Sequence, residues 1–231
     1  MCQALGYHRL PVNFSSDPSS PTSSTTSDSI NDTKSGLFWF AYMLDKGLSL
    51  RFGRSSVIQD YDITLPKAMS PLMNISDPWK VVLNLWILQA ELTGKVYEQL
   101  YSPGSMGRPA ELRIEAARTL AEEVKVLARE SDNLNKRMAD EDRHLATTGG
   151  NKAAGNAPVG FYTIDLVLKS DEVWYWSTLA LVYRAIPAGR GLSSTLNMEC
   201  IEASRKATSI HLECMELTEG SKFTQAAYLH W

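Results

Sequence analysis

The stretch Leu37–Phe52 constrains the fold of this chain more than any other feature. It reads LFWFAYMLDKGLSLRF, and apolar residues occupy nearly every side of the helix that this pattern predicts. One row recurs at steps of three and four, the spacing of a buried face, and consists of Leu37, Ala41, Leu44, Leu48 and Phe52. A helix that is apolar almost all round needs neighbours on several sides. We therefore expect it to be central to its domain.

Further helices are predicted from apolar periodicity and from capping residues. They cover 78–101, a long stretch that starts near Pro109, 161–186 and 193–218. The long stretch shows heptad-like spacing at Leu120, Val124, Leu127, Leu134 and Met138. Neither an alternating strand pattern of convincing length nor a repeat of fixed period stands out. We predict an all-α fold, an irregular multi-helix domain of about five long packed helices.

Two segments of the sequence predict loops. Residues 13–35 are rich in Ser, Thr, Asp and Pro, and such a segment buries too little apolar area to offset its ordering entropy. Residues 146–158 are rich in Gly, Asn and Ala and predict a second loop. With 231 residues the chain is long enough for one large domain, and we predict a single domain over 1–231.

Composition and charge exclude several classes of protein. The formal net charge is -3, whereas binding to nucleic acid through phosphates needs a clustered excess of Lys and Arg. The three cysteines are too few and too scattered for a disulfide framework, which favours a reducing compartment. The start of the chain lacks the basic and apolar pattern of a signal peptide. Its apolar runs are shorter than the roughly 20 residues that span a bilayer.

Motifs that carry catalytic or metal chemistry are weak. Cys200, His211 and Cys214 form the only local cluster of metal-ligand types, but a fourth ligand is missing nearby and Cys200 stands about three helical turns away. The four histidines lie in no catalytic signature, and neither a G-x-S-x-G elbow nor a phosphate-binding loop is present. We predict no catalytic, cofactor-binding or metal-binding residues. A small-molecule-binding enzyme of unknown type is kept as an alternative.

Asp45 is the notable charged residue of the first stretch. It flanks the apolar row between Leu44 and Leu48, where a carboxylate is costly without a partner. Gly53 suits the left-handed residue that closes a helix, and the segment after it, SSVIQDYDITLP, predicts an extended arm ending at Pro66. Arg51, Arg54 or a backbone amide of the arm could satisfy Asp45. We favour a structural ion pair that holds the arm against the helix, with ligand contact as the alternative.

This stretch resembles the signature of the fungal-specific transcription factor domain, also called the middle homology region or xylanolytic-activator-type regulatory domain, of zinc-cluster regulators. The family's Phe-Trp helix, Leu-Asp-basic step, Leu-Ser step, Gly-Arg and Ile-x-Asp-x-Asp-Ile arm closing on Leu-Pro have counterparts here. They are Phe38-Trp39, Leu44-Asp45-Lys46, Leu48-Ser49, Gly53-Arg54, Ile58 with Asp60, Asp62 and Ile63, and Leu65-Pro66. Ser55 departs from the Pro that commonly follows Gly-Arg, which leaves the start of the arm less rigid.

Two flanking segments agree with the resemblance. CQALGYHRL, residues 2–10, resembles the Leu-Gly-aromatic-His-Arg step that precedes the signature, and CIEASRKATSIHLECMEL, residues 200–217, resembles a later helix of the same domain. Relative to the family we expect the domain to be incomplete at its N-terminus. The resemblance marks eight residues as structural or as contacts of an effector or partner: Phe38, Trp39, Tyr42, Asp45, Gly53, Arg54, Asp60 and Asp62.

The resemblance implies a non-catalytic regulatory region that controls transcription in the nucleus. Family members usually carry a zinc cluster of six closely spaced cysteines, and these 231 residues hold three cysteines without that spacing. DNA and zinc binding are thus implied only through a module that this sequence lacks, and no cofactor is expected. The partners implied are transcriptional co-regulators, a homologous regulator in a dimer, or a small-molecule effector. A helical interaction or dominant-negative fragment is the alternative.

Overall fold

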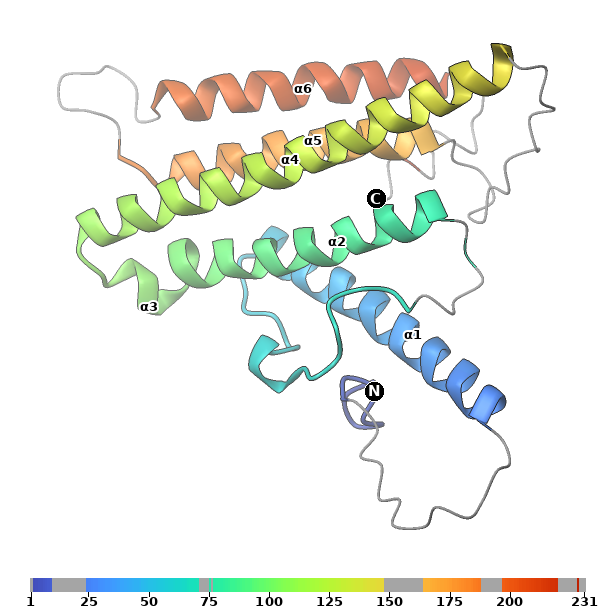
Figure 1. The fold of residues 1–231 in the computed structure, drawn as a ribbon. Coiled ribbons are helices and arrows are strands. Elements are labelled where there is room, and N and C mark those ends of the chain that lie inside the picture. Colours follow the sequence, from blue (N-terminus) through green and yellow to red (C-terminus); the bar gives the residue numbers. More distant parts are fainter. Residues whose placement is uncertain are drawn as a thin grey trace. The chain divides into compact units, whose positions relative to one another are not determined.

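The computed structural model describes residues 2–9, 24–70, 75, 77–147, 164–187, 197–219 and 228 (Figure 1). Helices account for most of these residues, and none of the described residues lies in a β-strand. The prediction of an all-α, multi-helix fold is confirmed. Among the described helices, none is both long enough and apolar enough to cross a membrane.

The helices follow the predicted order. The α-helices are α1 (Ser24–Arg51), α2 (Asp77–Val96), α3 (Pro103–Met106), α4 (Ala110–Thr147), α5 (Ile164–Arg184) and α6 (Met198–Thr218). Two shorter elements are the 3₁₀-helix η1 (Asp60–Asp62) and the π-helix η2 (Tyr97–Tyr101). The four helices predicted after the first one correspond to α2 with η2, α4, α5 and α6. The starts predicted at 161 and 193 lie outside the described residues, and the other predicted boundaries agree with the observed ones to within about two residues.

The described chain forms two compact units, Met1–Tyr97 and Glu98–Trp231, and each is described by itself. The first unit contains α1, α2 and the arm between them. The second contains α3 to α6. A single domain over 1–231 stays a prediction, because two compact units can be parts of one domain.

Helix α1 begins earlier than the sequence indicated. It starts at Ser24, so the loop predicted over 13–35 is wrong for 24–35, and 13–23 lie outside the described residues. Once the apolar part of a helix is formed, each further residue adds a hydrogen bond without a new nucleation cost. A tertiary contact also reaches this part of α1, since the Lys34 ammonium lies 5.8 Å from the centre of the Tyr7 ring.

The buried face of α1 differs from the predicted one. Of the predicted row, Ala41 is half-buried, while the side chains of Leu37, Leu44, Leu48 and Phe52 are exposed. The buried face is instead Phe38, Trp39, Tyr42, Lys46 and Ser49. Its aromatic rings pack edge to face and bury more area than the leucines would, in a core shared with Leu83, Ile87 and Ala90 of α2. The described residues of the first unit leave Leu37, Leu44, Leu48 and Phe52 of this row exposed.

The end of α1 matches the sequence interpretation, whereas the arm predicted as extended contains the 3₁₀-helix η1 at Asp60–Asp62. Gly53 has φ +63°, the left-handed value expected of a glycine that closes a helix. The Gly53 amide donates to the Leu50 carbonyl at 3.2 Å, and the Arg54 amide donates to the Ser49 carbonyl at 3.0 Å. This pair of hydrogen bonds is the Schellman arrangement. The arm then runs back along the unit, and Ile58 of the arm and Met69, which follows the arm, enter the aromatic core.

In the second unit α5 packs against both α4 and α6 (Figure 1). Of the heptad-like row on α4, Leu120, Val124 and Leu134 are buried, and the other two members are half-buried. Leu166 of α5 packs with Ile210 and Cys214 of α6 and with Tyr228. The loop predicted at 146–158 is wrong for 146–147, which end α4, and 148–158 lie outside the described residues.

Candidate functional site

Asp60 lies at the centre of a polar cluster between α1 and the arm. Its carboxylate accepts hydrogen bonds from the Tyr42 hydroxyl and the Lys46 ammonium, each at 2.5 Å. The Lys46 side chain is wholly buried and passes Gly94 of α2, whose missing Cβ leaves room for it. The Lys46 ammonium also lies 5.3 Å from the centre of the Tyr42 ring. The half-buried Asp60 carboxylate of the arm thus neutralises the buried Lys46 ammonium.

Asp45 is satisfied by backbone amides of the arm. Its two carboxylate oxygens accept from the Val57 amide at 3.1 Å and from the Ile58 amide at 2.8 Å. No ion pair joins Asp45 to Arg51 or Arg54 within the described residues, and both arginine side chains are exposed. The favoured ion pair is therefore wrong, and the backbone amide is the partner. The carboxylate of an aspartate suits this role because its two oxygens can accept hydrogen bonds from two successive backbone amides at once.

Asp62 connects the arm to the segment before α1. Its carboxylate accepts from the Arg9 guanidinium and lies 3.2 Å from His8 Nε2. The Thr64 amide donates to the His8 carbonyl at 3.1 Å, which adds a backbone bond to the side-chain contacts. The Arg9 hydrogen bond lowers the pKa of Asp62 against an opposing effect of burial, and the positive charge of Arg9 lowers it further.

The aromatic residues of the signature are core residues. Phe38, Trp39 and Tyr42 are all buried, and their rings lie 5.2 to 6.3 Å apart between centres. Trp39 Nε1 is buried without a hydrogen-bond partner. The structure thus places Phe38, Trp39 and Tyr42 together with Asp60, while Asp45 and Asp62 bind the arm to α1 and to the segment before it. Gly53 and Arg54 contribute only backbone amides, which cap the end of α1. The geometry of these residues together holds the arm against α1.

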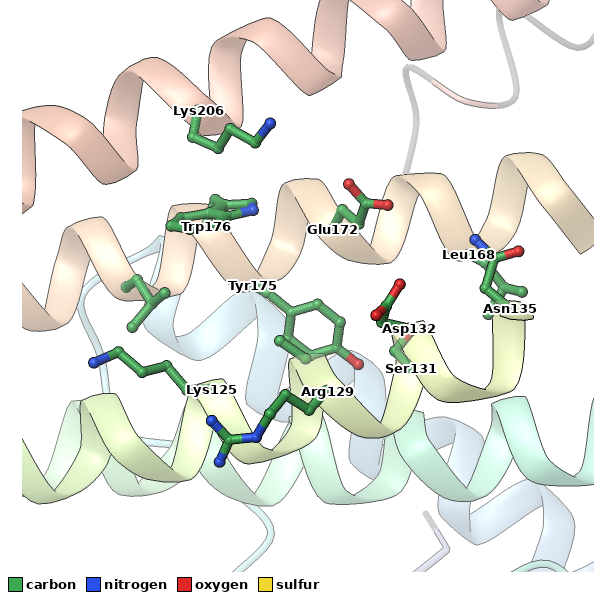
Figure 2. Close-up of a pocket in the computed structure, with 12 residues that line it drawn as sticks. Lys125, Arg129, Ser131, Asp132, Asn135, Leu168, Glu172, Tyr175, Trp176 and Lys206 are labelled. Atoms are coloured by element: carbon green, nitrogen blue, oxygen red, sulfur yellow. The ribbon is translucent and has the colours of Figure 1, made fainter. Parts of the chain in front are cut away.

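The second unit carries a groove that the sequence interpretation missed (Figure 2). It encloses about 400 Å³, and α4, α5 and α6 all contribute to its lining. Tyr175 and Trp176 of α5 lie between Arg129 of α4 and Lys206 of α6. Lys125 and Arg129 are four residues apart in the sequence, and this spacing indicates that they share one face of α4. Lys206 could not be assigned to the same place without knowing how α6 packs.

The Cys200, His211 and Cys214 cluster has no metal-site geometry. Cys200 donates its thiol to the Ala180 carbonyl at 3.4 Å, and His211 Nδ1 lies 2.7 Å from the Tyr228 hydroxyl. Burial raises the pKa of the Cys214 thiol, which disfavours the thiolate that a metal would need. No group of three side chains able to hold a metal ion occurs in the described part of the chain.

A family model of known proteins matches part of the chain. Residues 1–81 match the family model of the fungal specific transcription factor domain, so the resemblance is confirmed over those residues. They include α1, the arm and the start of α2. The family likeness of residues 200–217 stays a prediction, because the match ends before them. No curated protein and no solved structure matches the chain.

Proposed function

We propose that the chain is the helical regulatory region of a fungal zinc-cluster-type transcription factor, which tunes transcription of target genes in the nucleus without catalysing a reaction. The observation that carries the proposal is the family match over residues 1–81. The polar contacts of Asp45, Asp60 and Asp62 with α1, the arm and the N-terminal segment fall within the same residues. The matched family is a transcription factor regulatory domain rather than an enzyme family, which supports a non-catalytic role.

DNA and zinc binding are assigned to a separate module of the regulator. A zinc cluster uses six closely spaced cysteines, whereas Cys2, Cys200 and Cys214 are the cysteines of this sequence. No cofactor is assigned to the chain. Its role is to restrain or release the activity of a regulator in response to an effector or a partner protein.

A reporter experiment in fungal cells tests this role. The chain is fused to a heterologous DNA-binding domain and an activation segment, and reporter output is compared with the same fusion without the chain. We expect output to change at equal protein level. The Trp39→Asp variant, which places a carboxylate in the aromatic core, should abolish the change, while Arg108→Gln on an exposed position should keep it. Equal output from all four fusions contradicts the proposal.

The uncovered apolar row of α1 favours a second function, that of a protein-interaction fragment. The side chains of Leu44 and Phe52 are 61% and 69% exposed, and an exposed apolar helix face is typical of a contact surface. The partner would be a homologous regulator or a co-regulator. Leu44→Lys should abolish co-purification with a tagged full-length regulator, whereas Leu212→Lys on the exposed surface of α6 should not. Equal recovery of both variants argues against this function.

A further inference from the structure

The groove of the second unit has an apolar floor. Tyr175 and Leu179 of α5 are buried, and Trp176 is half-buried beside them (Figure 2). Leu168 extends the floor along α5. Its volume of about 400 Å³ falls within the range of roughly 300–1,000 Å³ that is usual for small-molecule sites. A compact ring system or a short aliphatic chain fits such a floor, and Trp and Tyr offer flat surfaces for it.

The charged side chains around this floor are unequally paired. Asp132 forms an ion pair with Lys136 at 2.6 Å, and Lys125 forms an ion pair with Glu122 at 2.7 Å. Glu172 lies 3.5 Å from Lys169. Lys169 also forms an ion pair with Glu213 at 2.8 Å.

Two cations are left without such a pair. Within the described residues, neither Arg129 nor Lys206 has a carboxylate at ion-pair distance. Each of the two acts on a carboxyl group only through its charge. Arg129 lowers the pKa of Glu122, and Lys206 lowers the pKa of Glu213. The lining residues and their partners together carry five cations and four carboxylates, an excess of one positive charge. An anion is therefore the complementary group for this groove.

We propose that this groove binds an anionic amphiphile, a small molecule with a carboxylate, sulfonate or phosphate on an apolar body. The apolar body lies on α5 beside Trp176, between Arg129 of α4 and Lys206 of α6, and the positive charge of these two side chains attracts the anionic group. Because the ligand contacts α4, α5 and α6 together, its binding stabilises their packing. The inference deepens the proposed regulatory function, and rests on it only for the ligand's role as an effector.

A matched pair of dyes tests the binding site on the full chain. The probe is 8-anilinonaphthalene-1-sulfonate, and its neutral counterpart is N-phenyl-1-naphthylamine, which has the same rings without the sulfonate. Fluorescence titrations use the parent chain, the double variant Arg129→Gln with Lys206→Gln, and the control Arg137→Gln with Arg205→Gln. The control removes the same charge from exposed positions of α4 and α6 that do not line the groove.

We expect the groove variant to bind the sulfonate dye about tenfold more weakly than the parent, which corresponds to losing about 1.4 kcal/mol. The neutral dye should bind the parent and the groove variant within about twofold. The control variant should behave like the parent with both dyes. Circular dichroism melts of the variants should match that of the parent, because all four substituted side chains are exposed.

Three outcomes overturn the inference. The first is that binding of the sulfonate dye to the parent chain does not saturate. The second is that its affinity is the same for the groove and control variants. The third is that the groove variant binds both dyes more weakly by the same factor. Binding of dye to the apolar row of α1 does not depend on Arg129 or Lys206. Such binding therefore cannot produce the expected loss of sulfonate-dye affinity in the groove variant. The titration tests binding to the groove and does not involve transcription. A failed titration therefore does not contradict the proposed regulatory function, and an unchanged reporter output does not contradict binding to the groove.

Discussion

Lys46 Nζ lies 2.5 Å from Asp60 Oδ2, and the two side chains are unequally exposed, at 0% for the lysine and 32% for the aspartate. The pair connects the buried face of α1 to the arm. If the aspartate is neutralised, the ammonium stays in the core without a counter-charge. If the lysine is made apolar, the carboxylate still reaches water and the Tyr42 hydroxyl. The two halves of this ion pair therefore differ in what their removal costs.

We predict that Asp60→Asn destabilises the chain by about 3 kcal/mol, the range seen when one partner of a buried ion pair is removed. Lys46→Met should change stability by no more than about 1 kcal/mol, since it fills similar volume without a buried charge. Urea denaturation followed by circular dichroism measures both. Asp132→Asn is the control, because its pair with Lys136 is exposed on both sides and should contribute less than about 1 kcal/mol. Equal costs for Asp60→Asn and Asp132→Asn would refute the burial argument.

Gly94 gives the second prediction. A Cβ at this position would meet Lys46 Cδ at 3.0 Å, Nζ at 3.1 Å and Cε at 3.3 Å. The lysine is held by Asp60 and cannot move aside freely. Gly94→Ala should therefore cost about 1 kcal/mol, although the same change inside a helix ordinarily gains roughly that amount. In a Lys46→Ala background the change should turn stabilising, and a double-mutant cycle measures this reversal.

Gly47 of α1 is the matched control for this cycle. A Cβ there would meet no atom within 4 Å, and the residue lies inside a helix as Gly94 does. Gly47→Ala should stabilise the chain by about 1 kcal/mol, whichever residue occupies position 46. A gain in stability from Gly94→Ala in the parent chain would show that Lys46 adapts freely.

The sequence predicts the helices well because apolar spacing and turn residues are local signals. It fails on the buried face of α1, where both faces are rich in apolar residues. The choice between Leu44 and Tyr42 depends on which face meets α2, and that packing is not encoded within the helix. The burial of Lys46 is equally non-local, because it needs Asp60 on the arm and the space beside Gly94. Arg129 and Lys206 share a groove only through the packing of α4 and α6 on α5.

Asp45 gives the third prediction, which concerns the start of the arm. Asp45→Ala removes the acceptor of the Val57 and Ile58 amides and should cost about 2 kcal/mol, as expected for hydrogen bonds to a charged group. Asp45→Asn keeps one acceptor oxygen and should cost less. Hydrogen exchange measured by mass spectrometry should show faster exchange at residues 57–58 in the alanine variant. Unchanged exchange at these amides would mean that the arm is held by its apolar contacts alone.

Asp62 gives the fourth prediction, a dependence of stability on pH. The Arg9 hydrogen bond lowers the pKa of this carboxyl below its ordinary value of 3.8. The unfolded chain then takes up a proton at higher pH than the folded chain does, so the contribution of Asp62 to stability is complete above the ordinary value. It is lost as the pH falls through 3.8 towards the lower folded value. The parent chain should therefore be more stable than Asp62→Asn near neutral pH, with the difference shrinking in acid.

Thermal melts across this pH range, with nuclear magnetic resonance titration of the labelled Asp62 carboxyl, measure the effect directly. Arg9→Gln should raise the pKa of Asp62 towards its ordinary value, because Arg9 is the largest cause of the lowering. Glu122→Gln is the control: Lys125 lowers the pKa of Glu122 too, but this pair is local to one exposed helix face. An exposed pair between residues three apart contributes little to stability, so its removal should change the acid dependence of the melts less than Asp62→Asn does. A titration of Asp62 that is the same with and without Arg9 would refute the assignment of this contact.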